Sequence, residues 1–214
     1  MVGEVLPDIT VPGAVTIGAA ATRIEEAPAI LDRARAVFAE ANAITLPAAF
    51  DPPFLRTILT VCRRGPFAPE HIGQIGWRTV EERDAAGSAL RFALERPAFV
   101  RWLEAVTGGE TLRALAGVVA EIAVGTGQEL GWHNDLHEGV LDRRLAVTIH
   151  LSDEAYDGGV FEMRDEASGR VLVREGALPP GSVMLFRIDR RLRHRVTPVT
   201  GGGPRRVFAG WFSV

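Results

Sequence analysis

A histidine and an aspartate near the middle of the chain have the types and spacing of metal ligands. His133 and Asp135 are separated by one residue in the segment 130–135, which we predict to be a strand. Residues two apart on a strand project from the same face, so an imidazole and a carboxylate would point together into the interior. Burying both groups without partners is costly, so a cation or a hydrogen-bond network must compensate them.

His194, on another predicted strand, could supply a third ligand. Two histidines and one carboxylate form the facial triad typical of non-haem Fe(II) oxygenases, in which open positions remain on the metal. Those positions suit a bidentate cosubstrate and dioxygen. We therefore predict that His133, Asp135 and His194 are the metal ligands and the catalytic residues.

A cosubstrate with a second carboxylate also needs a fixed cation at its far end. Arg205 and Arg206 open the last predicted strand, and a guanidinium can bind both oxygens of a carboxylate. Because side chains alternate along a strand, only one of these two arginines can point inward.

The other histidines and the remaining arginines and tryptophans near the site have simpler interpretations. His137 could be a fourth ligand, but Glu138-Gly139 suggests that the chain is leaving the strand, so we expect a loop histidine near the substrate. His71 is expected at the surface. Five arginines predict a solvated loop face or, alternatively, a basic rim for an acidic substrate: Arg187, Arg190, Arg191, Arg193 and Arg195. Three tryptophans are expected to pack internally, the last of them next to the pocket: Trp77, Trp102 and Trp132.

The composition excludes several other chemistries. The chain has 214 residues, 47% of them hydrophobic, which suffices for one compact domain with a core. All 24 basic residues are arginine, so no lysine is available for a P-loop or a Schiff base. The single cysteine, Cys62, excludes an internal disulfide, a four-cysteine zinc site and a cysteine-ligated iron–sulfur cluster. Cys62 lies on the apolar face of a predicted helix, which indicates core packing.

Charge and hydropathy limit the expected partners and location. The net charge of −3 gives no electrostatic basis for binding nucleic acid or an anionic membrane. No uncharged apolar run approaches the roughly 18 residues of a membrane span, and we expect no export signal, because residues 1–10 include Glu4 and Asp8 and no basic region. We therefore expect a cytoplasmic protein with no nucleic-acid or membrane partner.

The elements that would position the candidate site divide the chain near Gly108. The segment 65–82 before this point is irregular. Helical spacing of apolar residues predicts three helical segments, the first opened by a capping box and the third restarted by Pro97: 22–41, 54–62 and 88–106.

Short apolar runs dominate after Gly108, and many of them alternate with polar residues. They predict eight strands: 111–124, 130–135, 145–151, 159–164, 171–173, 182–186, 194–199 and 206–212. The first of these runs also fits a helix. Strands at this spacing, following a helical half, predict a sandwich or barrel, of which a jelly roll is the simplest form.

Four collinear blocks of the sequence resemble the 2-oxoglutarate- and Fe(II)-dependent oxygenases, in their prolyl-hydroxylase-like branch. The blocks are Val124–Asp135, Arg144–Leu151, Gly158-Gly159 and His194–Trp211. The resemblance implies a mainly β (α+β) fold, a double-stranded β-helix or jelly roll with helices packed on the major sheet. It also implies one compact unit, with an N-terminal helical extension at 1–44 and the oxygenase domain at 45–214.

By this resemblance, His133, Asp135 and His194 would bind Fe(II). 2-Oxoglutarate and dioxygen would be cosubstrates, and ascorbate is expected to stimulate turnover. The reaction would couple oxidative decarboxylation of 2-oxoglutarate to hydroxylation of a C–H bond. The expected substrate is a peptidyl, proline-like residue or a small amino-acid-like molecule.

The resemblance also assigns the residues that would bind the far carboxylate of 2-oxoglutarate. The family has a basic residue six positions before a tryptophan, and this spacing to Trp211 favours Arg205 over Arg206. His150 stands where relatives place a tyrosine on the same carboxylate. Val124 replaces a second tyrosine that relatives often have before the first ligand histidine.

Two other function classes use the same types of ligand. A cupin-like jelly roll could bind a metal ion as a sensor or an isomerase without 2-oxoglutarate, but it would have no reason to keep an inward cation such as Arg205. A zinc hydrolase could use the same three ligands. No glutamate is well placed as the general base of such a hydrolase, although Glu138 is close in the sequence.

Overall fold

The computed structural model describes residues 6–137 and 140–214. An eleven-stranded sheet dominates this part of the chain, and its neighbouring strands are antiparallel. Its strands are β3 (Ala43–Leu46), β4 (Phe67–Ile72), β5 (Gly76–Glu81), β6 (Ala114–Ile122), β7 (Leu130–His133), β8 (Arg143–His150), β10 (Phe161–Asp165), β11 (Val171–Glu175), β12 (Val183–Arg187), β13 (Leu192–Val196) and β15 (Arg205–Ser213).

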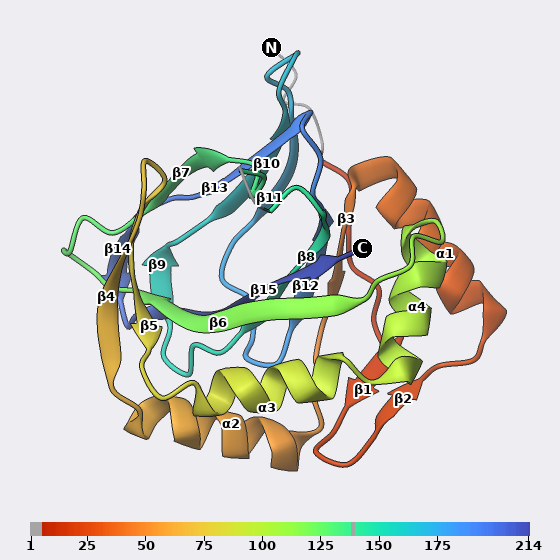
Figure 1. The fold of residues 1–214 in the computed structure, drawn as a ribbon, viewed down its shortest axis with the longest axis horizontal. Helices are drawn as coiled ribbons and strands as arrows, with labels where there is room; N and C mark the ends of the chain where they lie inside the picture. The colour runs from red at the N-terminus through yellow and green to blue at the C-terminus, as the bar shows by residue number, and fades with distance from the viewer. Residues whose placement is uncertain (1–5, 138–139) are drawn as a thin grey trace.

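The sheet curls into two layers that face each other (Figure 1). Strands β11, β10, β13 and β7 form the minor layer, and β5, β6, β15, β8, β12 and β3 form the major layer. The two layers are joined where Gly76 of β5 pairs with Leu130 of β7. Two small two-stranded sheets complete the strands: the hairpin of β1 (Val15–Ile17) with β2 (Thr22–Ile24), and the pair of β9 (Tyr156–Gly158) with β14 (Val199–Gly202). This architecture is the predicted double-stranded β-helix.

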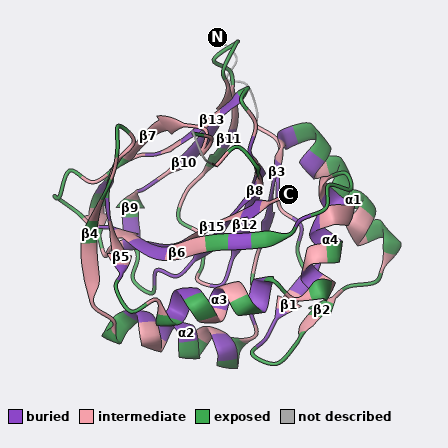
Figure 2. Cartoon of the chain, viewed as in Figure 1, coloured by how far each residue is buried: buried purple, intermediate pink, exposed green. Residues whose placement is uncertain are grey.

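Four helices in the described chain cover the outer face of the major layer: α1 (Pro28–Ala41), α2 (Pro52–Arg64), α3 (Ala85–Leu94) and α4 (Pro97–Thr107). Their inward faces are buried and their outward faces are exposed (Figure 2). The core between them and the sheet contains large apolar side chains from both, including Phe38, Phe99, Leu103, Phe208 and Phe212. Within the described residues, none of the helices is both long enough and apolar enough to cross a membrane.

A second apolar core fills part of the space between the two layers. Phe161 and Met163 contribute to it from β10, and Met184 and Phe186 contribute from β12. The sheet is therefore apolar on both faces of its major layer. Side-chain alternation then determines which residues of each strand reach the helices and which reach the interior.

The predicted strands after Gly108 are confirmed, including β6 in the segment that also fits a helix. The helix predicted to begin at Thr22 is wrong in its first turn, because 22–24 forms β2 and α1 begins at Pro28. The backbone of this segment pairs with β1 instead, with Thr22 opposite Ile17, and the Glu25 amide donates to the Ala14 carbonyl. The irregular segment 65–82 contains the hairpin β4–β5.

We predict that a single added methyl group at Gly117 destabilises the sheet. Gly117 of β6 faces Gly210 of β15, and the buried ring of Phe208 lies over both. A Cβ at Gly117 would lie 2.5 Å from the Phe208 ring and 2.8 Å from the Cα of Gly210. Gly117→Ala should lower the free energy of unfolding by about 1–3 kcal/mol in denaturant titrations, the usual cost of overpacking.

The matched control is Gly176→Ala, because nothing lies within 4 Å of a Cβ at that position. Equal unfolding midpoints for the two variants would contradict the close packing of β6 on β15.

Candidate active site

The three predicted metal ligands come together on the wall of a cavity between the two sheet layers. His133 ends β7 and His194 lies opposite it on β13, with 4.1 Å between ring centroids. The Asp135 carboxylate oxygens lie 3.4 Å from Nε2 of His133 and 3.3 Å from Nε2 of His194. One ligand atom from each residue lies within 4.8 Å of the others, so the group could hold a metal ion.

Asp135 reaches this position through a turn of the backbone that follows β7. The prediction that Asp135 lies on the same strand as His133 and points inward by alternation is therefore wrong. β7 ends at His133, and Asp135 has a φ of 59°, in the left-handed region that aspartate adopts more readily than most residues. The indole Nε1 of Trp211, on β15, donates a hydrogen bond of 2.7 Å to Oδ2 of Asp135. The carboxylate is therefore fixed from the opposite layer.

Hydrogen bonds, burial and neighbouring charges act on these side chains. In neutral His133, Nδ1 donates to the Gly131 carbonyl at 2.6 Å, so Nε2 carries no proton. Burial lowers the pKa of His194, which favours the neutral ring, whereas the neighbouring Asp135 raises this pKa. Burial alone would raise the pKa of Asp135, but the neighbouring His194 and His133 bring it well below its usual value.

Arg205 and Arg206 point to opposite sides of β15. Arg205 lines the cavity, is only 4% exposed, and has no hydrogen-bond partner at Nε in the described chain. Arg206 forms ion pairs with Glu121 and Asp153 and does not line the cavity. Of these two guanidiniums, only that of Arg205 is available to a ligand in the cavity.

Two more buried polar side chains lie next to Arg205. Burial raises the pKa of Tyr156, on β9, and the charge of Arg205 opposes this shift. Burial and the Arg205 charge lower the pKa of His150, at the end of β8, to about 3. Among described residues, neither ring nitrogen of His150 nor the Tyr156 hydroxyl has a hydrogen-bond partner. Unpartnered buried groups of this kind are uncommon, and this set fits a ligand with carboxylate oxygens.

The cavity has a volume of about 240 Å³, a size that suits a small molecule. Thr148 of β8 and the predicted loop residue His137 line it as well, whereas His150 and Tyr156 are not among its lining residues. His137 is not part of the group of three that could hold a metal ion.

Comparisons with known proteins agree with this geometry. The model of the 2OG-Fe(II) oxygenase superfamily matches residues 118–213, which include the triad and Arg205. Over this span the chain is similar to the 2OG-Fe(II) oxygenases. A comparison with curated proteins gives no match. The family match supports the general reaction, in which oxidative decarboxylation of 2-oxoglutarate is coupled to oxidation of a substrate, with Fe(II) as cofactor.

Several solved structures share the fold of this chain. A prolyl-4-hydroxylase from Pseudomonas putida has a TM-score of 0.64 and 19% identity, over 86% of this chain and 98% of that one. A 2OG-Fe(II) oxygenase family oxidoreductase from Burkholderia pseudomallei has a TM-score of 0.64 and 21% identity, over 89% and 93% of the two chains. A prolyl hydroxylase from Trichoplax adhaerens, in complex with a hypoxia-inducible factor peptide fragment, has a TM-score of 0.65 and 15% identity, over 86% and 89%.

The remaining sequence-based interpretations have mixed outcomes. None of the five arginines 187, 190, 191, 193 and 195 lines the cavity, and Arg193 and Arg195 form ion pairs with glutamates, which favours the solvated face. The prediction that Trp77 packs internally is wrong, because its side chain is 52% exposed and stacks on His71. Glu138, considered as a hydrolase base, lies outside the described residues.

Sequence reasoning missed three residues that shape the site: Tyr156, Trp211 as a partner of Asp135, and Arg143. Trp211 shares the inward face of β15 with Arg205, so strand alternation could have identified it. Tyr156 and Arg143 gave no comparable signal, because their contacts depend on strands that are distant in the sequence.

We predict that Trp211→Phe lowers metal affinity about 10- to 100-fold, the usual effect of removing a hydrogen bond to a ligand. The phenylalanine ring keeps most of the packing but cannot donate to Asp135. Affinity is measured by anaerobic titration with Fe(II) and by titration with Zn(II).

The matched control is Trp102→Phe, because Nε1 of Trp102 is buried in the helical core without a partner in the described chain. If Trp211→Phe binds metal as tightly as Trp102→Phe does, the indole does not orient the carboxylate.

Proposed function

We propose that this protein binds Fe(II) through His133, Asp135 and His194 and uses 2-oxoglutarate to hydroxylate a C–H bond. One observation supports this assignment above the others. The three metal-ligand types and the buried guanidinium of Arg205 line the same cavity. A cupin-like metal protein has no need of such a cation, and a bound 2-oxoglutarate does.

The residues of the chain have separate tasks in this proposal. The bound metal ion would supply the redox chemistry of dioxygen and coordinate the keto-acid end of 2-oxoglutarate. Arg205 binds both oxygens of the far carboxylate, since a guanidinium is always charged and planar. His150 and Tyr156 lie beside Arg205 outside the cavity lining, and their role in this proposal is to position its guanidinium. Trp211 holds Asp135 in place.

The substrate belongs to one of two classes. Two structural relatives are named as prolyl hydroxylases, one of them bound to a peptide, which supports a peptidyl, proline-like residue. The limited volume of the cavity supports a single residue or an amino-acid-like molecule near the metal site. The apolar walls formed by Phe161, Phe186 and Val196 exclude water around the target carbon.

We predict that Arg205→Gln raises the KM for 2-oxoglutarate roughly 10- to 100-fold, as expected for loss of a charged hydrogen-bond pair. Succinate formation is measured across 2-oxoglutarate concentrations. Arg205→Lys keeps the charge and should recover part of the affinity.

The control is Arg206→Lys, which keeps the ion pairs with Glu121 and Asp153 and should leave this KM unchanged. An unchanged KM in Arg205→Gln would refute the assignment of this residue.

A further inference from the structure

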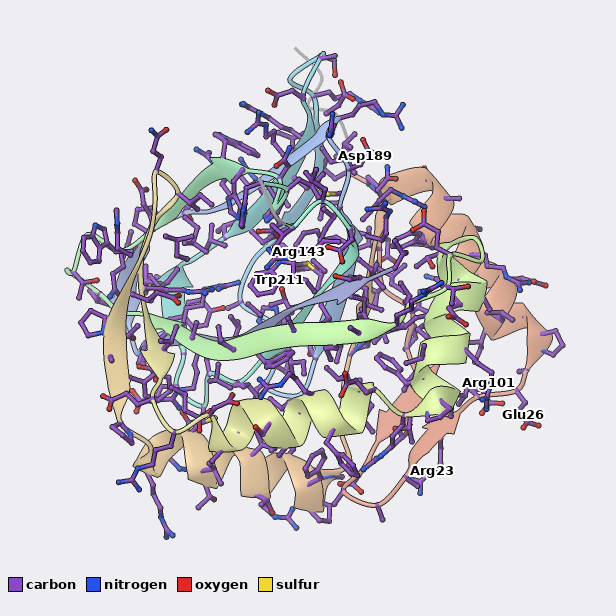
Figure 3. All side chains as sticks on the ribbon, viewed as in Figure 1. Arg23, Glu26, Arg101, Arg143, Asp189 and Trp211 are labelled. Atoms are coloured by element: carbon purple, nitrogen blue, oxygen red, sulfur yellow. The ribbon has the colours of Figure 1, made fainter. Side chains whose placement is uncertain are left out.

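The cavity contains a second guanidinium, that of Arg143, which the binding of 2-oxoglutarate does not use. Arg143 begins β8 and lies opposite Ser213, the last residue of β15, whereas Arg205 is the first residue of β15. Both side chains line the cavity. In Figure 3, Arg143 and Trp211 lie together in the interior between the layers. The two arginines therefore enter the cavity from opposite ends of the same strand pair.

Arg143 is held in place by groups of the metal site. Its guanidinium carbon lies 4.2 Å from the ring centroid of Trp211, and its Nη1 donates a hydrogen bond of 3.3 Å to the backbone oxygen of Asp135. Stacking on the indole fixes the plane of the guanidinium, which is the geometry needed to receive a carboxylate. Within 6–137 and 140–214, no carboxylate lies within ion-pairing distance of Arg143.

Arg78, on β5, lines the same cavity but already has a counter-ion. Its Nε lies 2.5 Å from a carboxylate oxygen of Glu70. Partial burial lowers the pKa of Arg143, and the positive charge of Arg78 adds to this effect, while Asp135 and Asp142 oppose it. Among the described residues, Arg143 therefore joins Arg205 as a cavity arginine without an ion pair, and Arg205 is already assigned to 2-oxoglutarate.

The charges of the proposed cofactor and cosubstrate leave Arg143 unbalanced as well. An Fe(II) ion, the Asp135 carboxylate, the doubly charged 2-oxoglutarate and the Arg205 guanidinium together carry no net charge. An anion bound directly to this half-buried guanidinium would balance its charge. The molecule that is oxidised can supply this anion.

We propose that Arg143 binds a carboxylate of the primary substrate, which is therefore a small free acid of the amino-acid type. This inference rests on the proposed function and selects one of its two substrate classes. An internal residue of a peptide has an uncharged amide where a free amino acid has its carboxylate. Because Arg143 contacts the backbone of Asp135, a carboxylate on it places the neighbouring carbons of a small acid close to the metal site.

The experiment compares matched acid and amide probes on the zinc-loaded protein saturated with 2-oxoglutarate. Zinc prevents turnover, and 2-oxoglutarate blocks the Arg205 site. The probes are acetate against acetamide, and N-acetyl-L-proline against N-acetyl-L-proline amide. Binding is followed by the guanidinium Nε–H signal of Arg143 in nitrogen-15 spectra, assigned by its loss in Arg143→Gln.

We expect saturable binding of each acid, about tenfold or more tighter than its amide. In Arg143→Gln, line-shape and competition measurements should show no preference for either acid over its amide. It should persist in Arg144→Gln, because Arg144 pairs with Glu110 and does not line the cavity.

Equal binding of acid and amide, tighter binding of the amide, or no binding of either acid would each overturn the proposal. The binding of 2-oxoglutarate to the same zinc-loaded samples separates this outcome from a failure of the proposed function. If 2-oxoglutarate binds and the acid preference is missing, only the assignment of Arg143 fails. If 2-oxoglutarate does not bind to the unmodified protein, the proposed function fails.

Discussion

The buried carboxylate of Asp135 is the charge on which the rest of the site depends. An isolated carboxylate cannot remain ionised in an apolar interior, so several groups must stabilise it. His133 and His194 lie within 3.4 Å of its oxygens, and Trp211 donates a hydrogen bond to it from the opposite layer. The indole orients the carboxylate, and a divalent cation bound between it and the two neutral imidazoles would keep it ionised.

Strand β15 positions several of the groups that surround this carboxylate. Its alternation directs Arg205 and Trp211 toward the cavity, and directs Phe208 and Phe212 toward the helices. The same alternation turns Arg206 away from the cavity to its own ion pairs. The helices therefore stabilise the major layer from outside, while its inner face is free to present cations and a hydrogen-bond donor.

Much of the fold and the site could be predicted, because the sequence patterns that indicate them lie within short segments of the chain. Alternating apolar runs identified the strands, and the residue types of His133, Asp135 and His194 indicated their chemistry. The turn at Asp135 could not be predicted, because its left-handed backbone is stabilised by contacts such as the bond to Trp211, 76 residues away in the sequence. The hairpin β4–β5 was missed because Pro69 and charged residues interrupt the alternation within it.

Anaerobic visible spectroscopy tests the central claim most directly. Apo-protein is titrated with Fe(II) and then with 2-oxoglutarate, alongside Asp135→Ala. The proposed site predicts a charge-transfer band that appears only when both are present and is missing in the variant. Stoichiometric binding of Fe(II) without any band after 2-oxoglutarate is added would contradict it, as would a band of equal intensity in Asp135→Ala.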